Sequence, residues 1–218
     1  MCSGLLIIEN DGSRFWVSRS ASDRRMCAIW GLMMVIGLLS SANYQWGQGA
    51  LASAPARWPH ASKLKHPERR AAIVMFLHPF CPCSRASLAE FANLARQAPV
   101  SADLQIIFLT SSKFTEAVET CERWREASKI PNAELSIDAD GKLARQFGAN
   151  TSGTVLVYDR ARRLLFDGGI TPGRGHVGPN PGIAAVTAIS RGEAQRHSDY
   201  PVFGCALFDT SICERAAR

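Results

Sequence analysis

The segment from Ile73 to Arg85 constrains the fold of this chain more than any other. It reads IVMFLHPFCPCSR, so an apolar run of strand length leads into two cysteines that are separated by one proline. An uninterrupted apolar run predicts a strand that is buried on both faces of a sheet. Because an amphipathic pattern of helical spacing follows, we expect Cys81 and Cys83 to lie where this strand turns into a helix.

Further strand-like and helix-like patterns alternate along the chain. Together they give the order β-α-β-α-β-α-β-β-α, which predicts an α/β fold with a central mixed sheet flanked by helices. The expected strands are residues 71–77, 104–109, 135–137, 155–158 and 163–166, and the expected helices are residues 85–97, 113–128, 141–147 and 183–190.

An uncharged stretch separates Arg25 from Arg57. Its apolar part, residues 26–44, just meets the requirement of roughly 17–25 apolar residues for a membrane-spanning helix. Basic residues precede this part, and the positive-inside rule therefore predicts a cytoplasmic N-terminus. The basic residues on that side are Arg14, Arg19, Arg24 and Arg25. We expect a single-pass protein of a bacterial-type inner membrane, with its C-terminal domain facing the periplasm or the outside.

Three other interpretations of the apolar segment are open. It is also compatible with a cleaved signal peptide ending at Ala52-Ser-Ala54, with a twin-arginine signal at Arg24-Arg25, or with a buried core helix. With an uncleaved helix, the chain divides into five segments. These are a cytoplasmic segment (1–25), a transmembrane helix (26–44), a linker rich in Ala, Pro, Gly and Ser (45–69), the folded domain (70–192) and a C-terminal tail (193–218).

The Cys-Pro-Cys motif predicts redox chemistry. If Cys81 is the N-cap of the helix, Pro82 occupies the first helical position, where proline is favoured. The free amides of the first turn then stabilise a thiolate, so we expect Cys81 to be the attacking sulfur and Cys83 the resolving one. A disulfide across one residue closes a very small ring, which favours a labile bond.

Other roles for these two cysteines remain open. They fit two inert buried thiols, or metal ligands. Zinc is disfavoured because no second Cys or His pair stands at finger spacing. Copper is favoured over zinc, since soft thiolates suit Cu(I) and His176 offers a third ligand.

The residues around the motif resemble those of thioredoxin-like proteins. Residues 76–85 resemble the strand–Cys–helix element, and residues 138–149 with 155–159 resemble the second half of membrane-tethered thioredoxins of the TlpA/ResA type. The Cys-Pro-Cys motif and the Thr-Pro-Gly-Arg-Gly-His segment at 171–176 are similar to a RedB-like family, and residues 203–205 extend the match. The resemblance implies a thioredoxin-like fold, protein thiols or disulfides as partners, and no cofactor.

Two departures from thioredoxins bear on the chemistry. Ser84 stands where thioredoxins have the second cysteine of Cys-x-x-Cys, and Gly153 stands where they have a cis-proline opposite the site. The glycine alters the surface on which substrate peptides dock. It also removes an obstacle to metal binding in this fold, which favours copper.

A glycine-rich loop at residues 168–182 carries Thr171, Arg174 and His176. It fits a plain solvated loop, but it also fits a loop that folds over Cys81, where Arg174 or His176 supports the thiolate or handles protons. His78 precedes the motif and either tunes it or packs at the strand end.

The remaining cysteines carry weaker signals. Cys121 shares an apolar helix side with Trp124, which indicates a buried inert thiol. Cys205 and Cys213 lie in the tail, where they form a disulfide, remain free, or, in the case of Cys205, reach the Cys81 site as an additional exchange partner.

The sequence therefore predicts an extracytoplasmic, membrane-tethered thiol–disulfide oxidoreductase. The rival hypothesis is a copper-binding chaperone that uses Cys81, Cys83 and His176, and a third is a non-catalytic binding domain. The net charge of +6 comes without interleaved aromatics or a nucleic-acid motif, so we expect no nucleic-acid partner.

Overall fold

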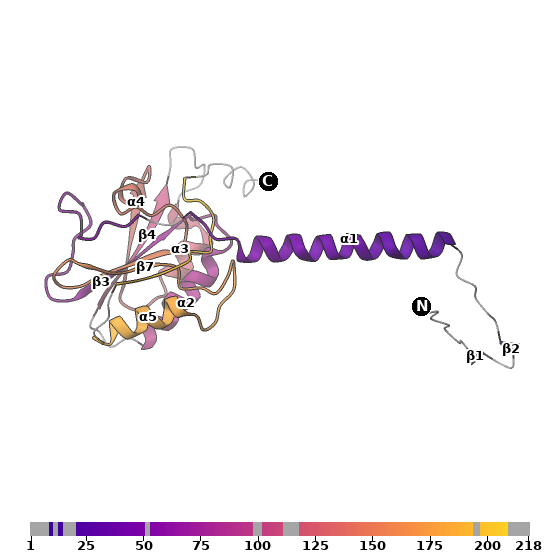
Figure 1. The fold of residues 1–218 in the computed structure, drawn as a ribbon. Coiled ribbons are helices and arrows are strands. Elements are labelled where there is room, and N and C mark those ends of the chain that lie inside the picture. The colour runs from indigo at the N-terminus through magenta and orange to yellow at the C-terminus, as the bar shows by residue number, and fades with distance from the viewer. Residues whose placement is uncertain are drawn as a thin grey trace. The chain divides into compact units, whose positions relative to one another are not determined.

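The computed structural model describes residues 9–10, 13–14, 21–50, 53–97, 102–110, 118–193 and 197–208. The chain separates into two compact units, Met1–Asn43 and Tyr44–Arg218 (Figure 1). The first unit contains a short antiparallel pair, β1 (Glu9–Asn10) and β2 (Ser13–Arg14), and most of helix α1 (Ala21–Trp46).

Helix α1 is long and apolar enough to cross a membrane, and it lies near the N-terminus. It begins at Ala21, before the predicted span, and none of its residues is buried. The buried core helix considered from the sequence is therefore wrong. A membrane anchor and a signal sequence both fit this helix.

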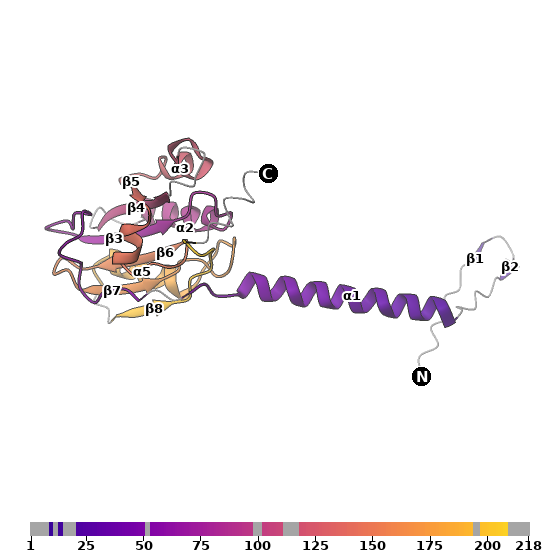
Figure 2. The ribbon, with the colours of Figure 1, turned by 90° about the horizontal axis from the view of Figure 1, so that it is seen from above.

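The second unit is built around a six-stranded sheet with the strand order β5-β4-β3-β6-β7-β8. Strands β3, β4 and β5 are parallel, β6 runs antiparallel to both β3 and β7, and β8 runs parallel to β7 (Figure 2). The strands are β3 (Ala71–Leu77), β4 (Ala102–Thr110), β5 (Ala133–Ala139), β6 (Thr154–Tyr158), β7 (Leu164–Gly168) and β8 (Ser198–Tyr200). The helices are α2 (Ser84–Gln97), the 3-10 turn η1 (Val118–Thr120), α3 (Glu122–Ala127), α4 (Lys142–Gln146) and α5 (Pro181–Ser190).

A parallel β-α-β unit followed by an antiparallel hairpin and a helix is the thioredoxin-like arrangement, and the predicted mixed α/β fold is confirmed. The expected hairpin at 155–166 is present as β6 and β7. The expected helix at 113–128 differs. Residues 113–117 lie outside the described residues, and the rest is divided at Cys121, whose Sγ accepts a hydrogen bond from Trp124 N at 3.4 Å as the N-cap of α3.

Strand β3 is buried on both faces, as its apolar run predicts, because successive side chains point to opposite sides of the sheet. Ile73 and Met75 lie in one core cluster with residues of α2 and α5, whereas Val74 and Phe76 lie in a second cluster on the α4 side. Figure 1 shows α2 and α5 on one side of the sheet and α4 on the other. This three-layer packing fixes the end of β3, from which the Cys-Pro-Cys motif emerges.

Described parts of the segments expected to be a linker and a tail pack into the domain. In residues 45–69, Trp58 is only 3% exposed and makes edge-to-face ring contacts with Phe147 and Tyr158, at centroid distances of 4.9 and 5.2 Å. In residues 193–218, strand β8 extends the sheet and Leu207 enters the core. A lone tryptophan among Ala and Pro carries no periodic signal, so the sequence pattern does not report this packing.

Candidate functional site: a cluster of three thiols

The Cys-Pro-Cys motif lies in the turn between β3 and α2. The amide of Ser84 donates to the carbonyl of Cys81 at 3.2 Å, and the amide of Ala86 donates to the carbonyl of Cys83 at 3.2 Å. These i→i+3 bonds form a tight turn ahead of the helix, and α2 itself begins at Ser84. Cys81 therefore precedes the first α-helical turn, rather than serving as its N-cap as the sequence suggested.

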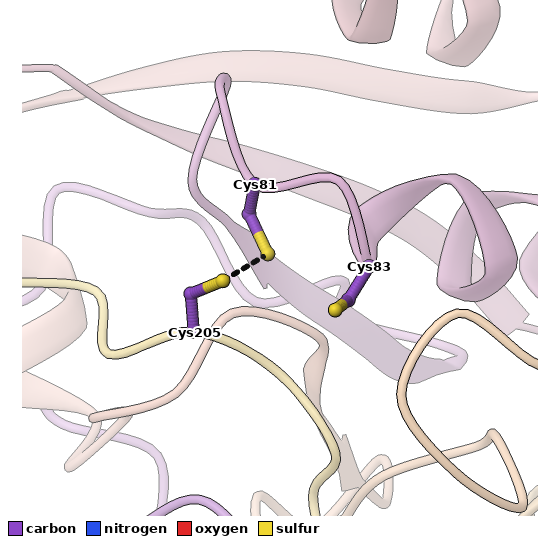
Figure 3. Close-up of side chains that lie close together, drawn as sticks. All are labelled: Cys81, Cys83 and Cys205. Atoms are coloured by element: carbon purple, nitrogen blue, oxygen red, sulfur yellow. Dashed lines mark hydrogen bonds between the residues drawn. The ribbon is translucent and has the colours of Figure 1, made fainter. Parts of the chain in front are cut away.

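Three cysteine sulfurs converge at this turn (Figure 3). The Sγ atoms of Cys81, Cys83 and Cys205 all lie within 4.8 Å of one another. Cys81 and Cys83 are 1% and 6% exposed, while Cys205 is half-buried. The Sγ atoms of Cys81 and Cys205 are 2.9 Å apart and share a hydrogen bond. Of the sequence-based options for Cys205, the structure realises its approach to the Cys81 site. Cys213 lies outside the described residues.

Backbone contacts with the loop before β6 hold Cys205 in place. The amide of Ser152 donates to the carbonyl of Cys205 at 2.8 Å, and the amide of Leu207 donates to the carbonyl of Asn150 at 2.8 Å. Gly204 allows this close approach, because a Cβ atom there would lie 1.9 Å from the Ser152 carbonyl oxygen. The tail is thus attached to the loop that occupies the place of the thioredoxin cis-proline.

Ser152 also joins this loop to both sides of the motif. Its Oγ accepts a hydrogen bond from the amide of His78 at 2.8 Å and lies 2.9 Å from Ser84 Oγ. His78 is buried, and its Nδ1 accepts from the amide of Phe80 at 3.2 Å. His78 and Ser152 therefore position the turn. No sequence pattern points to Ser152, since a single serine in a loop has no periodic signal.

The electrostatics of the cluster favour one thiolate, on Cys81. The hydrogen bond from the Cys205 thiol, and then that from the Cys83 thiol, lower the pKa of Cys81 far below its ordinary value, against the opposing effect of burial. The Cys205 backbone amide and the Ser84 hydroxyl add to this stabilisation. The sequence predicted a Cys81 thiolate held by helix amides, whereas the neighbouring thiols are the main cause in the structure.

The other two thiols remain protonated. Hydrogen bonds with Cys81 and then Cys83, together with burial, raise the pKa of Cys205. The Cys205 thiol lowers the pKa of Cys83, but the hydrogen bond with Cys81 and burial outweigh this, so the pKa of Cys83 is raised. Closely packed thiols cannot all ionise, since each thiolate repels the next. The site therefore holds one nucleophile and two proton-bearing neighbours.

The glycine-rich loop contributes Arg174 to the surroundings of the cluster. Its Nη1 donates to the carbonyl of Gly204 at 2.5 Å and its Nε donates to the carbonyl of Gly47 at 3.1 Å. The guanidinium lies 5.3 Å from the ring centroid of Tyr44, and its charge lowers the pKa of Cys83. Arg174 therefore supports the residue next to Cys205 instead of contacting Cys81 directly.

The other residues predicted to support the site occupy less central places. His176 is exposed, and its Nδ1 lies 2.8 Å from the Arg174 carbonyl oxygen. Pro82 is exposed within the turn, and Thr171 is buried in the loop. Among the described residues, the side chains that group as metal ligands at the motif are the three cysteines, without His176.

Comparisons with known proteins place the fold without naming a family. No protein-family model matches the chain, and no curated protein matches it. An uncharacterised conserved protein from Geobacillus kaustophilus is 17% identical, with 73% of this chain and 90% of that chain covered at a TM-score of 0.55. A hypothetical protein from Sinorhizobium meliloti is 21% identical, with 75% and 95% covered at a TM-score of 0.51. An exposed lipoprotein thioredoxin from Streptococcus pneumoniae is 17% identical, with 57% and 86% covered at a TM-score of 0.43. The first two likenesses agree with the fold seen in the strand order.

Proposed function

We propose that this protein is a membrane-tethered thiol–disulfide oxidoreductase of the RedB-like kind, with protein thiols and disulfides as partners. The observation that carries the proposal is the 2.9 Å contact between the Sγ atoms of Cys81 and Cys205. A disulfide requires a separation of about 2.05 Å, so a shift of about 1 Å would join these two atoms. The thioredoxin-like scaffold and the strand–turn–helix position of Cys81 support the same function.

In the proposed reaction the Cys81 thiolate attacks one sulfur of a partner disulfide. The partner disulfide breaks. The attacked sulfur forms a mixed disulfide with Cys81, and the other partner sulfur leaves as a thiolate that takes up a proton. Cys205 then loses its proton and attacks the Cys81 sulfur. A Cys81–Cys205 disulfide forms, and the partner sulfur that was bound to Cys81 leaves as a thiol. The partner gains two electrons, and the two cysteines lose them.

This assignment changes the role expected for Cys83. Cys83 is the more buried of the two neighbours, its sulfur lies within 4.8 Å of the Cys81 sulfur, and it lowers the pKa of Cys81. We therefore assign Cys83 to stabilising the attacking thiolate, and Cys205, which is half-buried and in direct contact with Cys81, to resolution.

Trapping the oxidised form tests the proposal. The full chain in detergent, fully reduced, is treated with glutathione disulfide, free thiols are alkylated, and disulfide-linked peptides are identified by mass spectrometry without reduction. We expect a peptide pair joining Cys81 to Cys205, and loss of all exchange in Cys81→Ser. The matched control is Cys121→Ser, which keeps a capping oxygen on α3 and should exchange normally. Exchange that survives in Cys81→Ser would refute the proposed function.

The membrane tether is a second part of the proposal. Arg24 and Arg25 precede the apolar stretch, and the next basic residue is Arg57, so the positive-inside rule orients the domain outside the cytoplasm. Reporter fusions test this orientation. An alkaline phosphatase fused to the C-terminus should be active, and a fluorescent protein that folds only in the cytoplasm should be dark. Active phosphatase in the soluble periplasmic fraction would instead indicate a cleaved signal peptide.

A further inference from the structure

The three-cysteine cluster has a second use that disulfide exchange does not require. Its sulfurs come from two parts of the chain, the turn that carries Cys81 and Cys83 and the tail that carries Cys205 (Figure 3). All three lie within 4.8 Å of one another. In a trigonal site with metal–sulfur distances of about 2.3 Å, the sulfurs are about 4 Å apart. The 2.9 Å contact between the Sγ atoms of Cys81 and Cys205 would have to open by about 1 Å to reach this geometry, which is the reverse of the movement that forms a disulfide.

We propose that the reduced protein binds one Cu(I) ion through Cys81, Cys83 and Cys205. Soft thiolates favour Cu(I), zinc and iron–sulfur clusters. A structural zinc ion, by contrast, almost always takes four ligands. Among the described residues, no fourth His, Cys, Asp or Glu joins this cluster. A site of three ligands, all of them soft sulfurs, therefore favours Cu(I).

This ligand set differs from the one that the sequence suggested. His176 was the expected third ligand, but its side chain is exposed and its Nδ1 lies 2.8 Å from the Arg174 carbonyl oxygen. Cys205 takes its place in the cluster. The proposed site is thus all-sulfur, and it depends on the tail that packs against Ser152.

The surroundings of the cluster suit a Cu(I) ion. Cys81 and Cys83 are 1% and 6% exposed, so most of the bound ion would be shielded from water and oxygen. Cys205 is half-buried, so it is the member of the cluster most open to solvent. Binding converts thiols to thiolates, and the cation offsets the repulsion between them. The guanidinium of Arg174 supplies further positive charge near Cys83.

Metal titration of the full chain tests the site. The protein is kept in detergent, reduced, freed of reductant without oxygen, and titrated with Cu(I) against a chromophoric Cu(I) chelator. The parent for this experiment retains only the three cysteines of the cluster. The residues changed to Ser in the parent are Cys2, Cys27, Cys121 and Cys213. We expect one Cu(I) per chain and an X-ray absorption spectrum with three sulfur neighbours and no nitrogen.

Two variants of this parent separate the ligand sets. Cys205→Ser should weaken Cu(I) binding by at least about 100-fold, since even the loss of a residue that only orients a ligand costs about 10–100-fold. His176→Ala should bind as the parent does. Equal binding by Cys205→Ser and the parent, a loss in His176→Ala, or tighter binding of Zn(II) than of Cu(I) would each overturn the proposal.

Failure of this inference can be distinguished from failure of the proposed function. Disulfide exchange is measured on metal-free protein, and Cu(I) binding is measured without any disulfide substrate. A chain that binds one Cu(I) through three sulfurs but does not exchange disulfides supports the metal site and contradicts the oxidoreductase. A chain that exchanges disulfides but binds no Cu(I) supports the oxidoreductase and contradicts the metal site.

Discussion

The backbone amide of Ser152 donates to the carbonyl of Cys205 at 2.8 Å. The Ser152 side chain also accepts from the amide of His78. This one serine therefore binds both the tail cysteine and the residue that follows β3. The two elements are distant in the sequence, and their shared partner explains how the Sγ atoms of Cys81 and Cys205 come within 2.9 Å.

Replacing Ser152 with Ala should lower the free energy of unfolding of the domain. The change removes the Oγ that accepts from the buried amide of His78, and the loss of such a buried hydrogen bond costs about 1–3 kcal/mol of unfolding free energy. Urea unfolding of the reduced protein measures the loss. The matched control is Ser128→Ala on the exposed end of α3, where we expect a change within about 0.5 kcal/mol. Equal stability of the two variants would show that the Ser152 side chain does not hold the site.

The thiol cluster should make stability depend on pH in two opposite ways. Cysteines in the unfolded chain ionise at about pH 8.5. The folded pKa of Cys81 is lowered by the Cys205 and Cys83 thiols, so the stability it contributes is fully present above about pH 8.5 and is lost as the pH falls towards the folded pKa. The raised pKa values of Cys83 and Cys205 act in the other direction, because folding keeps their protons on above about pH 8.5. We expect the free energy of unfolding to be highest at about pH 8.5.

Urea unfolding of reduced, metal-free protein across this pH range measures the effect. Cys81→Ser should remove the rise in stability towards about pH 8.5, since a serine hydroxyl does not titrate there. Cys121→Ser, outside the cluster, should keep the pH profile of the wild type. A rise that persists unchanged in Cys81→Ser would rule out a Cys81 thiolate as its source.

Arg174 should affect the stability of the domain through its hydrogen bond to the Gly204 carbonyl, and it should affect the pKa of Cys83 through its charge. Arg174→Gln removes the charged hydrogen bond to the Gly204 carbonyl, so we expect a loss of about 1.5–3 kcal/mol in unfolding free energy. The pKa of Cys83 should also rise further, because the guanidinium lowers it in the wild type. The pH dependence of thiol alkylation, read at each cysteine by mass spectrometry, measures this shift. His176→Ala is the control and should leave both quantities unchanged, given its exposed side chain. An alkylation profile of Arg174→Gln identical to that of the wild type would contradict the electrostatic role.

The sequence predicts most of the sheet because its strands carry strong local patterns. The continuous apolar run of β3 and the paired strands of β6 and β7 are confirmed by their burial and register. The start of α2 is less well predicted, since the turn at Cys81–Ser84 uses i→i+3 bonds that share the residue preferences of a helix start. The site depends even less on local pattern. Cys81 and Cys205 are 124 residues apart in sequence, and no spacing rule reports a contact over that distance.

The segment expected to be a linker, residues 45–69, shows the same limit of local sequence pattern. Trp58 lies within a segment of Ala, Pro and polar residues, yet its ring fills the core on the α4 side of the sheet. Trp58→Ala should therefore lower the unfolding free energy of the domain by about 3–5 kcal/mol, by removing a large buried side chain. Trp46→Ala, at a position that is 62% exposed, is the matched control and should cost far less. Urea unfolding followed by circular dichroism measures both variants. A flexible tether would make the two substitutions equivalent, so a difference of several kcal/mol would establish that the domain begins before β3.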